Sequence, residues 1–186
     1  RYQKLVATLE DSYDYVIYDM PPVGTFVDAA ILSTLVDGTV LVVKPGSTKR
    51  SELVDACEQL KKKKQASNML EVQNAAKTLF ANIRFMSPDN PIRSIVMTSS
   101  VPNEGKSTCS VELARAIATS GKTVLLVEAD MRRRTLASLL NVRPAAGVYA
   151  VLTDAAPLKT AVTPTQTPNL FFLDVEPNIP NPADII

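Results

Sequence analysis

The stretch SIVMTSSVPNEGKSTCSVELARAIA, residues 94–118, decides the fold of this chain. An apolar run ends at Met97 and Thr98, a polar turn follows, and the tetrapeptide GKST (105–108) opens an amphipathic helical pattern. A loop that runs into a helix N-terminus brings several backbone N–H groups and the positive end of the helix dipole to one point. The stretch therefore predicts a strand, a phosphate-binding loop and a helix.

The residue types of the loop fit a bound nucleotide. Lys106 should reach the β- and γ-phosphates as a point charge, and Ser107 should place its hydroxyl on Mg²⁺. We expect the charge of Lys106 to matter only when phosphates are present, because nothing else obvious near the loop needs neutralising. The pattern G-x-x-x-x-G-K-[ST] is matched imperfectly, since Ser100 stands at the first glycine. The residues expected to contact ATP or ADP are Pro102, Asn103, Glu104, Gly105, Lys106, Ser107 and Thr108.

Carboxylates follow two other apolar runs. VLLVEADMRR contains Glu128 and Asp130, and YDYVIYDMPPV contains Asp19. Ligands of open α/β sheets bind outside the carboxyl ends of the strands, so we expect these carboxylates to converge on the phosphate loop. Asp19 and Asp130, together with Ser107, are the expected Mg²⁺ ligands. The structural alternative for each carboxylate is a helix cap or a turn.

Short β-branched runs alternate with helical patterns along the whole chain. This rhythm predicts an α/β fold with a doubly wound, mostly parallel sheet and helices on both faces. We expect strands at 15–19, 38–43, 92–98, 123–128 and 169–173. We expect helices near 2–11, 27–36, 51–62, 68–86, 106–120 and 134–140, and loops with one helix start in the proline-rich stretches 157–168 and 177–182.

Composition excludes several classes of function. The chain has 186 residues, 20 basic and 19 acidic side chains and a net charge of +1, which gives no support for nucleic-acid binding. Histidine is absent, so Ser-His triads and His-ligated zinc sites are excluded. Cys57 and Cys109 fit neither a disulfide framework nor a metal cluster, which favours the cytoplasm. No apolar run reaches 18 residues and the N-terminus is no signal peptide, so a membrane location would depend on something outside this chain.

Three motifs together resemble those of the bacterial tyrosine kinases of capsule and exopolysaccharide synthesis. The motifs are TSSVPNEGKST, VLLVEADMRR and VIYDMPPVGTFVDAAILSTLVDG. In that family they correspond to Walker A, Walker A′ and Walker B. The resemblance implies a P-loop NTPase fold and an ATP-dependent tyrosine autokinase that regulates polysaccharide polymerisation and export. It implies a base role for Glu128 towards an incoming tyrosine, within a catalytic set of Lys106, Glu128, Asp130 and Arg132.

The resemblance also implies a location and partners. We expect a cytoplasmic domain held at the inner face of the cell membrane by an activator protein, or by a fused transmembrane region, that is not in this chain. The family's self-association motif E-x-x-R-x-x-R aligns with Asn74, Lys77 and Phe80, which lack its charge pairing. The family's C-terminal tyrosine cluster is absent, and the five tyrosines present are best read as packing residues.

The order of the motifs differs from the family's order. Walker B stands first here, so the chain is predicted to be circularly permuted, with one domain made of a Walker B half at 1–62, a joint at 63–70 and a Walker A half at 71–186. This interpretation predicts that Arg1 and Ile186 are neighbours.

Two further functions stay open from the sequence. The partition and septum-site ATPases share the P-loop group, but they usually carry a lysine where this chain has Val101. A nucleotide-binding scaffold without transfer activity is the third reading.

Overall fold

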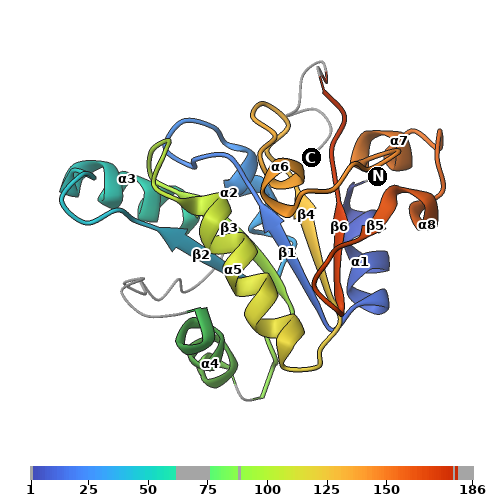
Figure 1. Cartoon of the computed structure of the whole chain (residues 1–186). Helices are drawn as coiled ribbons and strands as arrows, with labels where there is room; N and C mark the ends of the chain where they lie inside the picture. The colour runs from blue at the N-terminus through green and yellow to red at the C-terminus, as the bar shows by residue number, and fades with distance from the viewer. Residues whose placement is uncertain (1, 62–75, 88, 178, 180–186) are drawn as a thin grey trace.

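The sheet has six strands in the order β2-β3-β1-β4-β6-β5 (Figure 1). The computed structural model describes residues 2–61, 76–87, 89–177 and 179. Every neighbouring pair in the sheet is parallel except β5 and β6, which are antiparallel. The strands are β1 (Tyr15–Asp19), β2 (Gly38–Val42), β3 (Ser94–Ser99), β4 (Val124–Glu128), β5 (Val162–Pro164) and β6 (Leu170–Leu173).

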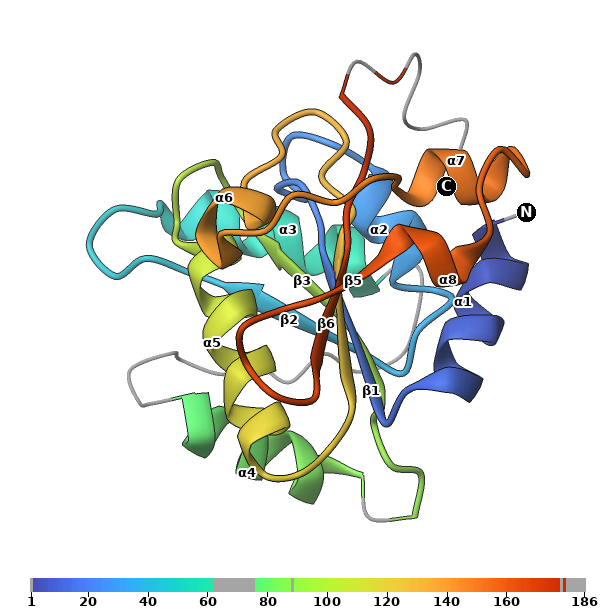
Figure 2. The same ribbon diagram turned by 45° about the vertical axis from the view of Figure 1, so that its right-hand side comes forward.

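Helices cover both faces of this sheet, and Figure 2 shows α1 on the side opposite α5. Along β1 the buried side chains alternate, so Val16 and Tyr18 join one apolar cluster while Tyr15 and Ile17 join the other. The first cluster includes residues of α1 (Tyr2–Ser12), α2 (Asp28–Leu32), α3 (Arg50–Lys61), α7 (Val148–Leu152) and α8 (Leu158–Ala161). The second includes residues of α4 (Ala76–Met86), α5 (Lys106–Thr119) and α6 (Leu136–Leu140). The predicted doubly wound α/β fold is confirmed.

The three strands that precede the sequence motifs lie side by side at the centre of the sheet. β1 pairs with β3 on one side and with β4 on the other, and Asp19 is in register with Met97 and with Glu128. Just after the end of β1, the Met20 amide donates to the Met97 carbonyl of β3 at 2.9 Å, and the Thr98 hydroxyl of β3 donates to the Pro21 carbonyl at 2.8 Å. The carboxyl ends of all three strands therefore open at one edge.

The sequence located five of the six strands and missed β5, which lies in the proline-rich stretch expected to be loop. β5 pairs only with β6, and its Pro164 has no N–H to donate. The short helix α7 was not predicted either, and α8 falls in that same proline-rich stretch. α2 ends at Leu32, earlier than the predicted residue 36, because the N–H groups of Thr34 and Leu35 bond to carbonyls three residues back instead of four.

Some expectations fall outside the described residues. The predicted joint at 63–70, the first part of the expected helix 68–86, and both chain ends, Arg1 and Ile186, lie there. The circular permutation and the two-half domain division therefore stay predictions. In the part of the chain that the structure describes, no helix is long and apolar enough to cross a membrane.

Candidate active site

The loop between β3 and α5 adopts two left-handed backbone conformations. Asn103 has φ 66° and Gly105, the residue before α5, has φ 88°. A Cβ added at Gly105 would meet no atom within 4 Å, so its backbone conformation rather than crowding calls for glycine. α5 begins at Lys106, and its first turn presents N–H groups at the edge of the sheet where the motif strands end.

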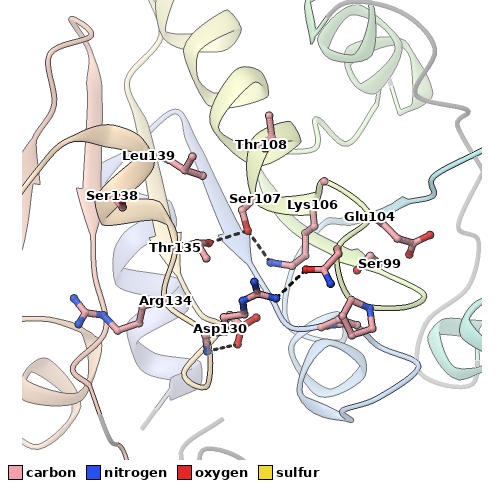
Figure 3. A pocket seen from close by; sticks show the side chains of 15 residues that line it. Ser99, Glu104, Lys106, Ser107, Thr108, Asp130, Arg134, Thr135, Ser138 and Leu139 are labelled. Atoms are coloured by element: carbon pink, nitrogen blue, oxygen red, sulfur yellow. Dashed lines mark hydrogen bonds between the residues drawn. The ribbon is translucent and has the colours of Figure 1, made fainter. Parts of the chain in front are cut away.

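This loop forms one wall of a cavity of about 520 Å³ (Figure 3). The opposite wall comes from the segment after β4 and from α6. All seven loop residues expected to contact nucleotide are in the lining, and so is Asp130. The full lining is Pro22, Ser99, Pro102, Asn103, Glu104, Gly105, Lys106, Ser107, Thr108, Asp130, Arg133, Arg134, Thr135, Ser138 and Leu139.

Asp19 lies beneath this cavity and is fully buried. Its Oδ2 accepts hydrogen bonds from Lys106 Nζ at 2.8 Å and from the Ser107 hydroxyl at 2.7 Å. Its Oδ1 accepts from the Ser110 hydroxyl at 2.7 Å. A buried carboxylate requires such partners, because an unpaired charge in the protein interior is costly.

This ion pair corrects one expectation about Lys106. The sequence suggested that its charge matters only when phosphates are present, but Lys106 also neutralises the buried Asp19. The charge of Lys106 therefore stabilises the fold even without nucleotide.

Asp130 lies in the cavity lining and is 6% exposed. Its Oδ1 accepts the backbone N–H groups of Arg132 at 3.2 Å and Arg133 at 3.0 Å, which fixes the direction of the carboxylate. Burial raises the pKa of Asp130, and the nearby charge of Lys106 opposes that rise. Asp130 is thus a carboxylate that faces the cavity and is held by the turn that follows it.

Glu128 is fully buried and lies outside the cavity lining. Its Oε2 accepts the N–H groups of Thr135 at 2.8 Å and Leu136 at 3.0 Å, so it holds the start of α6. Burial, and secondarily the charge of Asp19, raise the pKa of Glu128 to about 8. Glu128 therefore caps the start of α6, which is the structural alternative that the sequence analysis named for these carboxylates.

The raised pKa of Glu128 predicts a pH-dependent stability. The folded chain keeps the Glu128 proton up to about pH 8, whereas an unfolded chain loses it near 4.5. The stabilisation that protonated Glu128 gives to the folded state is fully present below the unfolded pKa of about 4.5. It is lost as the pH rises towards and through the folded pKa of about 8. In Glu128→Gln the amide oxygen can still accept from Thr135 and Leu136 but cannot ionise. Denaturant unfolding between about pH 5 and pH 9 should therefore show that the unfolding free energy of the variant rises relative to that of the parent as the pH rises. Parallel pH profiles would contradict it.

Arg132 is not among the residues that line the cavity. Its guanidinium pairs with the fully buried Asp28 and lies 4.1 Å from the ring centroid of Phe26. It thereby ties the segment after β4 to the segment after β1. Arg133 instead lines the cavity and donates to the Asn103 side chain at 2.9 Å.

Four site residues escaped the sequence reasoning: Ser110, Thr135, and the lining residues Ser138 and Leu139 of α6. Ser110 follows Lys106 by one helical turn, so the period of α5 could have placed its hydroxyl beside Asp19. Thr135 Oγ1 donates to Ser107 Oγ at 3.1 Å, which brings α6 into the site. Figure 3 shows Ser107 lying between Lys106 and Thr135. No local sequence pattern predicts the role of Thr135, because its contact with Ser107 joins residues that are 28 positions apart.

The donor set fits magnesium held jointly with phosphates. Among the described residues there is no group of three or more His, Cys, Asp or Glu side chains that could hold a metal alone. Mg²⁺ is usually bound by one or two carboxylates plus substrate phosphates and water. Asp19, Asp130 and the Ser107 hydroxyl form a set of that kind, with Lys106 and the loop amides available for the phosphates.

The residues aligned with the self-association motif lie on and before α4. Lys77 is exposed, whereas Phe80 is 8% exposed and packs edge-on against Tyr15 at 5.4 Å between ring centroids. Asn74 lies outside the described residues. Phe80 is therefore a core residue on the inner side of α4.

Comparison with known proteins supports the same group of folds. The family model of the ATPase MipZ matches residues 93–170. The tyrosine-protein kinase YwqD of Bacillus subtilis (strain 168) is 36% identical over 110 residues, which is 59% of this chain and 46% of that protein. The crystal structure of the chimerical protein CapA2B2 matches with a TM-score of 0.56 and 26% identity, covering 86% of this chain and 64% of that chain. The BceF tyrosine kinase domain matches with a TM-score of 0.54 and 27% identity, covering 85% and 64%.

These matches confirm the resemblance and the fold class that the motifs predicted. The chain spans less than half the length of YwqD and 64% of each of the two solved chains.

Proposed function

We propose that this chain, a relative of the bacterial tyrosine-protein kinases, binds Mg·ATP in the cavity and transfers the γ-phosphoryl group to tyrosine. The observation that carries the proposal is the joined arrangement of Lys106, Ser107 and Asp19 beneath a left-handed loop at a helix N-terminus. Phosphoryl transfer depends mostly on positioning and on neutralising charge. These three side chains supply a cation for phosphate and two oxygen ligands for a metal.

Lys106 would exchange its bond with Asp19 for bonds to the β- and γ-phosphate oxygens. Asp19 and the Ser107 hydroxyl would then be free to ligate the cation, together with Asp130 from the facing wall. Bound Mg²⁺ supplies neutralisation of the charge on the transferred group. The amides of the loop that ends at Gly105 would hold the phosphates in line for transfer.

The base that accepts the tyrosine proton is proposed to be Glu128, by the family resemblance. With a pKa of about 8, Glu128 is mostly protonated at neutral pH and accepts a proton more readily as the pH rises, and the amides of Thr135 and Leu136 already occupy its Oε2. Asp130 faces the cavity and is the competing base.

The two assignments differ in a measurable way. If Glu128 is the base, Glu128→Gln should slow transfer by roughly 10²–10⁴ while Mg·ATP affinity stays near that of the parent. Asp130→Asn should instead weaken the response of transfer to Mg²⁺ concentration, because the amide removes a charge that the cation requires. Transfer by Glu128→Gln at the parent rate would exclude Glu128 as the base.

Burial limits which tyrosine can accept the phosphoryl group. Tyr2, Tyr15 and Tyr18 are at most 9% exposed, and burial raises the pKa of all three. Tyr13 and Tyr149 are only half-buried. Burial therefore argues against Tyr2, Tyr15 and Tyr18 alone, and we propose that the acceptor is one of the two half-buried tyrosines or a tyrosine supplied by a segment outside this chain or by another molecule.

The alternative function is a partition-type ATPase, which the match to the ATPase MipZ model favours. Water is then the acceptor, so release of ADP should not respond to added tyrosine. For the proposed kinase, a tyrosine-containing peptide should increase the rate of ADP release, and the matching phenylalanine peptide should not. An equal rate with both peptides would favour the ATPase.

Location and partners are proposed only from the relatives. We propose that the domain acts at the inner face of the cell membrane, brought there by an activator or a membrane segment outside this chain. We also propose that the chain can form a homo-oligomer, although its self-association motif is degraded at Asn74, Lys77 and Phe80.

A further inference from the structure

The side chain of Glu104 joins the phosphate loop to a second segment. This segment, residues 43–49 between β2 and α3, is called the β2–α3 segment below. Glu104 Oε1 accepts the backbone N–H of Lys44 at 3.2 Å and also the hydroxyl of Thr48. Glu104 Oε2 accepts the backbone N–H of Val101 in the phosphate loop at 2.9 Å. One carboxylate thus holds two segments that are 56 residues or more apart in sequence.

The contact is largely shielded from water. Glu104 is 7% exposed, although the segment that it holds is mostly exposed. Figure 3 shows its side chain pointing away from Lys106 and Ser107. A charged acceptor in a shielded position makes stronger hydrogen bonds than a neutral one.

We propose that Glu104 is a positioning residue that couples the phosphate loop to the β2–α3 segment, so that nucleotide in the cavity orders this segment. Glu104 fixes Val101, at the start of the loop whose amides must be aligned for phosphate. A change in the loop is passed to Lys44 and Thr48 through the other oxygen. Coupling between two sites is reciprocal, so a partner that binds the β2–α3 segment would also change the affinity for ATP.

This inference rests on the proposed binding of Mg·ATP. It is tested by measuring amide hydrogen exchange of residues 43–49 with and without Mg·ATP, together with the affinity for Mg·ATP. In the parent, nucleotide should slow exchange in this segment. Glu104→Gln presents an N–H₂ group to one of the donors, so its affinity for Mg·ATP should fall about tenfold and the slowing should disappear.

Two further variants separate a loop effect from a segment effect. Thr48→Val removes the hydroxyl but leaves Glu104 on Val101, so the nucleotide-dependent slowing should weaken while affinity falls less than in Glu104→Gln. Glu52→Ala is the matched control, because the Glu52 carboxylate accepts the Lys49 N–H of the same segment at 2.9 Å without reaching the phosphate loop. Its affinity for Mg·ATP should equal that of the parent.

The outcomes distinguish this inference from the proposed function. A parent that binds Mg·ATP and a Glu104→Gln variant with the same affinity and the same exchange response would overturn the coupling alone. Equal losses in Glu104→Gln and Glu52→Ala would also overturn it, because the effect would then come from general loosening of the segment. A parent that binds no Mg·ATP would overturn the proposed function and the coupling together.

Discussion

Lys106→Met should lower the affinity for Mg·ATP by about 100-fold or more, because the methionine keeps the chain length but makes no charge-assisted bond to phosphate. The structure adds a second effect. Lys106 Nζ lies 2.8 Å from Oδ2 of the fully buried Asp19, so the variant leaves that carboxylate without its cation. Removal of one partner of a buried ion pair costs about 3–5 kcal/mol of unfolding free energy. Titration with a labelled ATP analogue and denaturant unfolding measure the two effects.

The control for Lys106→Met is Lys122→Met. Lys122 Nζ lies 3.8 Å from Asp14, and both side chains are about half exposed, so this pair lies in water. Exposed pairs contribute little to stability, so neither stability nor Mg·ATP affinity should change much. Undiminished affinity in Lys106→Met would place the nucleotide elsewhere.

Asp19→Asn should abolish most phosphoryl transfer at ordinary Mg²⁺ concentrations. In one orientation Asn keeps the acceptor for the Ser110 hydroxyl but turns its N–H₂ group towards Lys106 and Ser107. In the other it offers them a neutral oxygen and turns the N–H₂ group towards Ser110. Loss of even an outer-shell partner of a metal ligand typically costs about 10–100-fold in metal affinity or activity, so loss of a ligating carboxylate should cost at least as much. We expect a loss of about 100-fold in rate, partly restored when Mg²⁺ is raised. The measurement is the rate of transfer as a function of Mg²⁺ concentration.

Asp14→Asn is the matched change at the opposite end of β1. The Asp14 carboxylate accepts the N–H and hydroxyl of Thr123 and is absent from the cavity lining. This variant should transfer phosphate with the Mg²⁺ dependence of the parent. An Asp19→Asn variant with that same dependence would remove Asp19 from the metal site.

The sequence predicted the fold well because its signals are local. The nearly continuous apolar runs of β1, β3 and β4 are typical of strands covered on both faces, and the loop before Lys106 shows its turn and helix start directly. β5 was missed because it is only three residues long and one of them is a proline, so no apolar run marks it. α7 was missed for a related reason, since the carboxylate of Glu176, 26 or more residues away, accepts N–H groups at its start.

The sequence indicated which residues belong to the candidate site but not which of them contact one another. Motif position identified Lys106 and Asp130 as lining residues and placed Asp19 beside the loop. It could not indicate that Lys106 neutralises Asp19, or that Glu128 turns to the start of α6. Those contacts depend on the register between neighbouring strands and on the path of the chain after β4, which no local pattern carries.

The fate of the γ-phosphoryl group tests the central claim most directly. The parent chain and Lys106→Met are incubated with Mg·ATP and a tyrosine-containing peptide, and mass spectrometry measures phosphotyrosine while inorganic phosphate is measured in parallel. The account predicts phosphotyrosine in step with ADP release in the parent and neither product in Lys106→Met. ADP and inorganic phosphate without phosphotyrosine, or bound nucleotide without turnover, would contradict it.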